Sequence, residues 1–387
     1  MDQWLCVAKK ASSEELTLNV QKYKFTHSTR SKMSTQIRQL DFSGQTIFIG
    51  LDVHLKNWRV SIYLGEVAQR TFHLSPPGVE VLESYLKRHY PGGQYKCAYE
   101  AGFSGFWIQE GLSTRGIETI VTHAADIPTT DKERQQKDDV RDSNKIARSL
   151  RNGDLEAIYI PDKGLQQDRG VVRERWRLQC DRKRVMNRIK SQLHFYGLYS
   201  EGGVLSNWRW SQQFLNFLAE QGKDNVALGM LLEEFNMLRG LERQAMAALR
   251  RIFKHERYAN LMKLLLSVPG VGFLTAVQLL TEIGDMKRFK KFDELCFYVG
   301  LIPGTQSSGE TVHADRRTSR GNKHLRTTLI ESAWVAIRQD PELALTYSNL
   351  KKRMDGPHAI IKIARKLLNR IRRVWLSGQP YSIAIAE

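Results

Sequence analysis

A change of residue pattern near residue 162 most constrains how this chain can fold. Before it, three short β-branched and aromatic runs over 45–75 indicate strands, with a turn at 54–57, and 78–90 has apolar residues at helical spacing. After it, residues 165–258 carry heptad-like apolar positions with few helix breakers, a pattern that predicts long helices in an antiparallel pair. Strands interleaved with helices, followed by helices alone, predict an α/β domain with a mixed sheet and then a helical remainder.

The same patterns divide the 387 residues into four segments, because a chain of this length exceeds one typical core. We predict a flexible arm over 1–45, an α/β domain over 46–162, a helical or coiled-coil segment over 163–258 and a mainly α-helical domain over 259–387. Within the last segment, a Gly/Ser-rich loop is expected at 300–323, and a basic helix is expected at 357–376.

The balance of charge favours a polyanionic partner. The chain has 59 Lys and Arg against 41 Asp and Glu, a formal net charge of +18. Nucleic acid is the first candidate and an anionic membrane surface the second. No uninterrupted apolar run approaches the ~18–20 residues of a spanning helix, and the first residues lack a signal-peptide pattern. Four cysteines without a CxxC or Cys/His cluster favour a reducing cytoplasm, where the protein would associate with the nucleoid.

Four acidic residues stand in unusual positions for this basic chain, two in apolar strand runs and two close together in a basic stretch. Asp52 lies inside an apolar strand run, and Glu100 ends another. An acid in such a place is costly to bury unless it is paired or holds a cation. Asp139 and Asp142, in the stretch RQQKDDVRDSNKIARSLRNGD (134–154), are three residues apart and share a helix face, where like charges repel.

Together these four carboxylates predict a cage for a hard divalent cation, Mg²⁺ or Mn²⁺. Two such ions about 4 Å apart would support phosphoryl transfer. The neighbouring Lys137 and Arg141 would then face phosphates. Each acid alone also has a structural interpretation: a turn cap, the end of a strand, or a solvated helix face.

Glycines at 269–272 (PGVG) indicate a helix-hairpin-helix element. Gly270 and Gly272 lie between two apolar helical segments, where backbone N–H groups can approach a phosphate. The alternative is a plain helix–helix turn.

A second candidate site follows in GLIPGTQSSGETVHADRRTSRGNKHLRTTL. Ser307 and Ser308 are expected in a loop, and a hydroxyl becomes nucleophilic only with help from a base or cation. Cations that would contact nucleic acid and stabilise a pentacoordinate phosphate follow closely: Arg316, Arg317, Arg320, Lys323 and Arg326. On chemistry alone, a loop serine is ordinarily a turn residue.

Two basic helical stretches are further candidates for nucleic-acid contact. Residues 169–190 contain nine Lys/Arg against two acids, with Trp176 among them. Residues 362–375 repeat the theme, with an apolar stripe at Ile363, Leu367, Ile371 and Val374. Composition does not separate RNA from DNA as the ligand.

The motifs IGLDVH, YEAG and KDDVRDSNKIARSL resemble those of the DEDD transposases of insertion sequence family 110. The resemblance implies a RuvC-like domain of RNase H fold with Asp52, Glu100, Asp139 and Asp142 as metal-binding catalytic acids; Asp138 stands where the family usually has Thr. PGVGFLTAVQLLTEIGD, GLIPGTQSSGE and SRGNKHLR are similar to the second half of the same transposases. They imply Ser308 as the recombinase nucleophile, with adjacent Ser307 as the rival, and Arg320 where the family has Lys.

The resemblance therefore implies a Mg²⁺-dependent DNA transposase or recombinase that forms a phosphoserine link in a composite site. It further implies guidance by a non-coding RNA and assembly into a homodimer or homotetramer. Two alternatives stay open. A metal-dependent RuvC-like nuclease or junction resolvase would form no covalent adduct, and a non-catalytic nucleic-acid-binding protein would not need Asp52.

Overall fold

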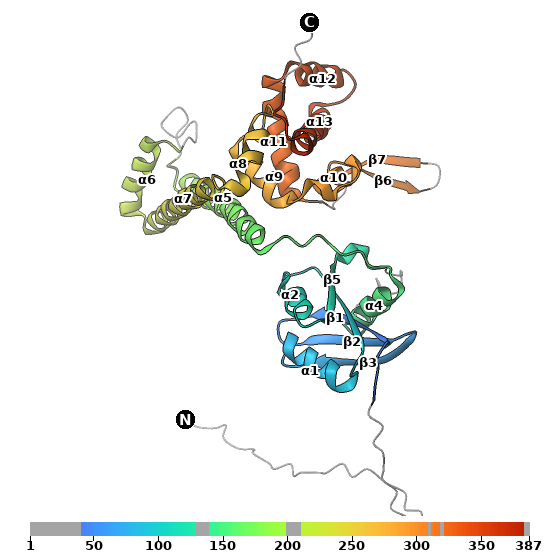
Figure 1. Cartoon of the computed structure of the whole chain (residues 1–387). Coiled ribbons are helices and arrows are strands. Elements are labelled where there is room, and N and C mark those ends of the chain that lie inside the picture. The colour runs from blue at the N-terminus through green and yellow to red at the C-terminus, as the bar shows by residue number, and fades with distance from the viewer. Residues whose placement is uncertain (1–39, 129–138, 199–209, 309–310, 318–320, 383–387) are drawn as a thin grey trace, which may run out of the picture. The chain divides into compact units, whose positions relative to one another are not determined.

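The structure, a computed structural model, describes residues 40–128, 139–198, 210–308, 311–317 and 321–382, without the side chains of 139–141 and 303–317 (Figure 1). Its contacts divide the chain into two compact units that meet in sequence at Ile158 and Tyr159. Lys137, Arg320 and nearly all of the predicted arm lie outside the described residues.

A mixed five-stranded sheet forms the centre of the first unit. Its strands are β1 (Thr46–Val53), β2 (Trp58–Leu64), β3 (Val67–Leu74), β4 (Gln94–Glu100) and β5 (Glu118–Thr122), in the order β3-β2-β1-β4-β5. β1 pairs in parallel with β4, and β4 with β5, whereas β2 is antiparallel to both β1 and β3. The predicted strands and the mixed sheet are confirmed.

Helices cover both faces of this sheet. α1 (Val79–His89) and α2 (Trp107–Ser113) lie on one side, and α4 (Asp139–Asn152) lies on the other (Figure 1). Because successive side chains of a strand point to opposite faces of the sheet, alternate residues of β1 face the two layers of helices. Ile47, Ile49 and Leu51 of β1 are fully buried on the α1–α2 side, whereas Gly50 faces α4.

α4 packs unusually close to β1. A Cβ atom at Gly50 would lie 2.2 Å from the Ser143 carbonyl oxygen and 2.4 Å from the Ala147 nitrogen, so only a glycine fits. Cross-strand neighbours of Gly50 are also small, namely Ser61 on β2 and Ala98 on β4. The buried Ser61 hydroxyl lies 2.9 Å from that of Ser143. Small residues across the sheet therefore allow the helix backbone to rest on it.

The second unit begins with a long helical hairpin. α5 (Lys163–Phe195) and α7 (Val226–Ile252) pack together, with α6 (Gln212–Asp224) between them in sequence. Arg182 pairs with Glu242 at 2.7 Å, and further along α5, Arg188 pairs with Glu234 at 2.6 Å. As residue numbers rise on α5 they fall on α7, so the predicted antiparallel pair is confirmed.

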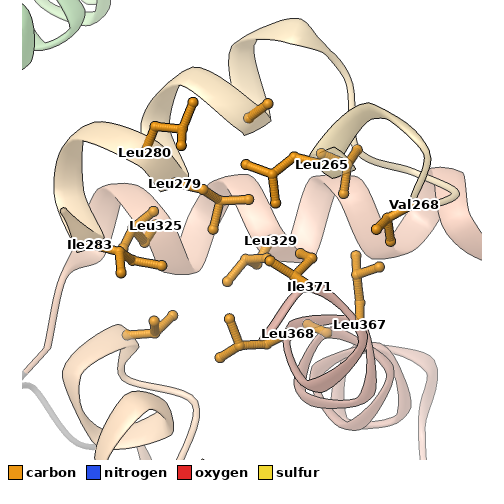
Figure 2. Close-up of a cluster of buried hydrophobic side chains, with 14 of the residues drawn as sticks. Leu265, Val268, Leu279, Leu280, Ile283, Leu325, Leu329, Leu367, Leu368 and Ile371 are labelled. Atoms are coloured by element: carbon orange, nitrogen blue, oxygen red, sulfur yellow. The ribbon is translucent and has the colours of Figure 1, made fainter. Parts of the chain in front are cut away.

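The remaining helices of this unit surround one apolar core. They are α8 (Glu256–Leu266), α9 (Phe273–Ile283), α10 (Phe292–Val299), α11 (Lys323–Gln339), α12 (Pro341–Lys351) and α13 (Gly356–Ser377). Figure 2 shows leucines and isoleucines of α8, α9, α11 and α13 meeting in this core. The predicted stripe on the basic helix, Ile363, Leu367, Ile371 and Val374, is buried in it. Among the described helices, none is both long and apolar enough to cross a bilayer.

The Gly/Ser-rich segment departs from prediction. Where a loop was expected at 300–323, β6 (Pro303–Ser308) and β7 (Thr311–Arg317) pair as an antiparallel hairpin. Ser307 and Ser308 therefore belong to a strand. Composition missed it because the pairing depends on backbone hydrogen bonds, whereas glycine and serine weaken the side-chain pattern that marks a strand.

A buried carboxylate links three elements of the second unit. Glu282, 2% exposed at the end of α9, accepts two hydrogen bonds from Arg173 of α5 at 2.7 and 2.8 Å. Asn322, the N-cap of α11, donates a third at 2.8 Å. Burial raises the pKa of Glu282, but the bonds and charge of Arg173 outweigh it and hold that pKa below its ordinary value.

We expect Gly50→Ala to destabilise the protein by roughly 2–3 kcal/mol, because the added methyl group forces α4 away from the sheet. Chemical denaturation measures this. Gly170→Ala is the matched control, since nothing lies within 4 Å of its Cβ position in α5, and helical alanine is favoured over glycine. Equal stability of the wild type and Gly50→Ala would contradict the close packing.

We expect Arg173→Met to cost roughly 3 kcal/mol at pH 7, because it leaves the Glu282 carboxylate buried without its cation. A group with a depressed pKa contributes stability above its unfolded pKa, near 4.5, and loses it as pH falls through the folded pKa. Unfolding measured from pH 7 to pH 3 should therefore show the difference between wild type and variant shrinking below pH 4.5. Arg177→Met, which breaks an exposed pair with Glu174, is the control.

Candidate active site

Two of the predicted acids are neighbours at one edge of the sheet. In the parallel register of β1 and β4, Leu51 is the partner of Tyr99, so Asp52 and Glu100 follow side by side at the carboxyl ends of their strands. The Asp52 side chain is 22% exposed and lies 3.0 Å from His54 Nε2. Glu100 is exposed.

α4 brings the remaining acids to this edge. Arg151, in the last turn of this helix, donates to the Glu66 carbonyl, beyond the end of β2, so the helix runs antiparallel to β1. Asp139 begins the helix one turn before Ser143, which rests on Gly50, and Asp52 lies two residues after Gly50. The distance along α4 from Ser143 back to Asp139 and the distance along β1 from Gly50 to Asp52 are each about 6 Å. The first turn of α4 therefore reaches the level of Asp52. The side chain of Asp139 is outside the described residues, and Asp142 is exposed.

The pKa of Glu100 depends on two of the other predicted acids. Partial burial raises the pKa of Glu100, and the negative charges of Asp142 and Asp52 raise it further. His123 and Lys145 act in the opposite direction but do not cancel the rise. Glu100 is therefore close enough to Asp52 and to Asp142 for the negative charge of each to act on it.

The donor set suits a hard cation in chemistry, because carboxylate oxygens are the ligands that Mg²⁺ prefers. Among the described side chains, which exclude that of Asp139, no three His, Cys, Asp or Glu residues lie close enough to form a finished cage. Glu100 thus has two carboxylates near it, and Asp139, the fourth predicted acid, is described only by its backbone.

Two histidines at the same edge escaped the sequence interpretation. His54 follows Asp52 by two residues, the spacing that puts both on one side of an extended chain. His123 follows β5 directly, and its Nδ1 accepts a hydrogen bond from the Ala125 N–H at 3.1 Å. Their position directly after predicted strands could have identified them, because the carboxyl ends of parallel strands meet at one edge of a sheet.

The predicted nucleophile lies in the second unit. Ser308 is the last residue of β6 and pairs with Thr311 beside the hairpin tip. Ser307 precedes it in the same strand and pairs with Val312. Arg316 and Arg317 end β7, and only the backbone of both arginines, as of Arg141 in α4, is described.

The glycines of the PGVG turn have unequal surroundings. Gly270 has φ +85°, its N–H donates to Gln339 Oε1 at 2.8 Å, and a Cβ atom there would lie 2.4 Å from the Ser332 carbonyl oxygen. It therefore packs against α11. Gly272, the N-cap of α9, is exposed with nothing within 4 Å of its Cβ position. Lys323 is exposed at the start of α11, and Arg326 is half-buried one turn later.

All seven arginines of the basic stretch 169–190 bond within the protein. Arg169 donates to the Thr281 carbonyl, and each of six others pairs with an acid: Arg173, Arg175, Arg177, Arg182, Arg184 and Arg188. Three of these acids, Glu234, Glu242 and Glu282, come from α7 and α9. Much of the excess positive charge in this stretch is thus neutralised by glutamates far along the chain.

Comparisons with known proteins match two separate parts of the chain. Residues 49–197 match a family model described as a transposase, of the DEDD type of IS110, and residues 262–348 match the model of the transposase IS116/IS110/IS902 family.

Individual relatives point the same way. A putative transposase of Sinorhizobium fredii is 31% identical over 62% of this chain and 58% of its own length. A second from the same organism is 30% identical over 70% of this chain and 74% of its own length. The pilin gene-inverting protein of Moraxella bovis is 32% identical over 32% of this chain and 39% of its own length. The two family models and the extent of the second match show that this chain belongs to the IS110 family of DEDD transposases.

Proposed function

We propose that this insertion-sequence transposase cuts and rejoins DNA with Asp52, Glu100, Asp139 and Asp142 as its catalytic acids. The observation that carries the proposal is the position of Asp52 and Glu100, side by side at the carboxyl ends of β1 and β4, with α4 packed against β1 at Gly50. Partial burial and the negative charges of Asp142 and Asp52 raise the pKa of Glu100, which agrees with this placement. Repelling carboxylates at a strand edge are unfavourable for stability unless a cation joins them. The strand order β3-β2-β1-β4-β5, with β2 alone antiparallel among the five, supports the RuvC-like, RNase H-type interpretation.

The four acids would hold Mg²⁺ or Mn²⁺, with Asp139 completing the set. A divalent ion bound there would supply positive charge beside the scissile phosphate. The protein itself would position the DNA backbone, with the backbone of α4 supplying a helix N-terminus and Arg141 a cation at the same edge.

The covalent step of the proposal belongs to Ser308. Its Oγ forms a bond to phosphorus, the bond from phosphorus to one deoxyribose oxygen breaks, and the proton lost from Oγ is balanced by protonation of that leaving oxygen. A free DNA end would reverse the same exchange. The name of the Moraxella relative, a gene-inverting protein, supports rejoining as well as cutting.

Partners follow from the same proposal. A net charge of +18 supports nucleic-acid partners, and the guide RNA implied by the family resemblance remains part of the proposal. Strand exchange between two duplexes needs at least two sites, so we propose a homodimer or homotetramer. The exposed apolar residues of α7, Val226, Met230, Met237 and Leu241, support the helical hairpin as its contact surface.

Metal binding provides the first test. Without metal at pH 7.5, Glu100→Gln should unfold at a higher temperature than wild type, because a carboxyl group with a raised pKa destabilises the fold once pH exceeds about 4.5. With Mg²⁺ at 100 times its Kd, wild type should gain about 2.7 kcal/mol and the variant much less. Calorimetry with and without Mg²⁺ measures both effects.

Glu118→Gln is the matched control, since this acid lies at the start of β5, at the opposite edge of the sheet, and pairs with Lys96. It should keep the full gain from Mg²⁺. A gain in Glu100→Gln equal to that of wild type would remove Glu100 from the metal site. No gain in any protein would count against the metal-dependent mechanism.

The covalent step provides the second test. Full-length protein with Mg²⁺, element-end DNA and the flanking non-coding RNA should give an SDS-stable protein–DNA band. Ser308→Ala and Asp52→Asn should each reduce that band roughly 10³-fold or more, whereas Ser307→Ala should keep it. Mass spectrometry of the linked peptide then identifies the residue.

Other outcomes have defined meanings. Loss of the band in Ser307→Ala with retention in Ser308→Ala would exchange the two serines. Cleaved DNA without a band would favour a hydrolytic nuclease, and tight binding without cleavage would favour a non-catalytic binding protein.

A further inference from the structure

A groove of about 1050 Å³ lies between α5, the α8–α9 turn and α11, wholly within the second unit. Its walls come from the middle of α5, from the turn that contains Gly270 and Gly272, from the first half of α9, and from one side of α11 along its whole length. The Arg173–Glu282–Asn322 link joins α5, α9 and α11 and so holds these walls in position. The volume is at the upper end of ordinary ligand pockets.

An aromatic pair forms part of the groove wall. Trp176 of α5 is 39% exposed, and its ring meets that of His324 of α11 edge-to-face, with centroids 4.3 Å apart. Burial lowers the pKa of His324, so its ring is neutral at pH 7. A half-exposed indole in a concave site offers a flat apolar surface suited to another planar ring.

Cations flank this aromatic surface. Lys183 and Lys323 are exposed lining residues, and within the described parts of the chain neither pairs with an acid. Arg175 is held by Glu242 and Gln179, and Glu331 is the one acidic side chain among the described lining residues. α9 also begins here, and its N-cap Gly272 supplies no capping side chain. The groove thus combines an aromatic face, free positive charge and a helix N-terminus.

We propose that this groove binds an unpaired nucleotide of a DNA or RNA strand, with the base stacked on Trp176 and the phosphates beside Lys183 and Lys323. Bases inside a duplex have both faces covered by their neighbours, so only an unpaired or extruded base can stack on a protein ring. The inference rests on the proposed function only in taking nucleic acid as the partner. It adds a site for single-stranded segments that the four acids and Ser308 do not provide.

Fluorescent oligonucleotides test the stacking. Short single strands of DNA and of RNA, each with a central 2-aminopurine, are titrated into the full-length protein without Mg²⁺, so that no cleavage occurs. Stacking on Trp176 should change the probe's fluorescence. Trp176→Ala should weaken binding about 5- to 100-fold, in line with the contribution of one base–aromatic contact, and Trp176→Phe should restore most of it.

Trp334→Ala is the matched control. This tryptophan also lies on α11 and is similarly exposed, at 37%, but it packs against Tyr347 away from the groove. Its replacement should leave binding unchanged. A fully paired duplex carrying the same probe should bind without the fluorescence change. Equal affinity of wild type and Trp176→Ala for both strands would overturn the proposal.

Salt dependence tests the two lysines separately. Lys183→Gln and Lys323→Gln should each reduce the slope of log K against log salt by about 0.7 for the single strand, the value for one phosphate contact. Lys351→Gln, an exposed lysine of α12, should leave the slope unchanged. Unchanged slopes in both groove variants would remove the phosphates from this site.

Failure of this proposal and failure of the proposed function give different results. If Trp176→Ala binds single strands as wild type does while the covalent band still depends on Ser308, only the groove is wrong. If the probe stacks on Trp176 while no Mg²⁺-dependent cleavage occurs, the groove stands and the catalytic proposal fails. Binding of DNA alone or RNA alone identifies which strand the groove takes.

Discussion

The contact of α4 with β1 at Gly50 is the constraint on which the candidate site depends. Two of the acids, Asp52 and Glu100, are placed by strand pairing alone. The other two reach the same edge only because the α4 backbone rests where a side chain would otherwise lie. A larger residue at position 50 would push α4, and with it Asp139 and Asp142, away from β1.

In the second unit, two residues of a stretch that carries the family resemblance have a clear structural role. Gly321 and Asn322 lie in SRGNKHLR, one of the stretches that carries the family resemblance. Gly321 has φ +111° and passes so close to Gly300 that a Cβ atom would lie 2.7 Å from its backbone. Asn322 accepts a hydrogen bond from the Leu325 N–H, which caps α11, and donates another to Glu282. Both residues serve the start of α11 and the wall of the groove.

Charge was the least predictable property of this chain from sequence. The position of Asp52 beside Glu100 met expectation, because strand ends determine which residues share an edge. The basic stretch of α5 did not. Arg182 and Arg188 form ion pairs with Glu242 and Glu234 of α7. These partners are far away in sequence, so only the packing of α7 against α5 brings them close. The free cations of α5 are consequently fewer than composition indicates, and Lys183 becomes more significant.

The sequence by itself determined the five strands of the first unit, the long helices of the hairpin, the buried stripe of α13 and the edge of the sheet where Asp52 and Glu100 meet, because these depend on residue periodicity and local pairing. Its motifs also placed the chain in its family. Only the tertiary structure decided the closeness of α4 to β1, the pairing of β6 with β7, the ion pairs of α5 and the groove beside Trp176. Each of these joins residues from elements distant in sequence, and such contacts depend on volume and charge that meet only after folding.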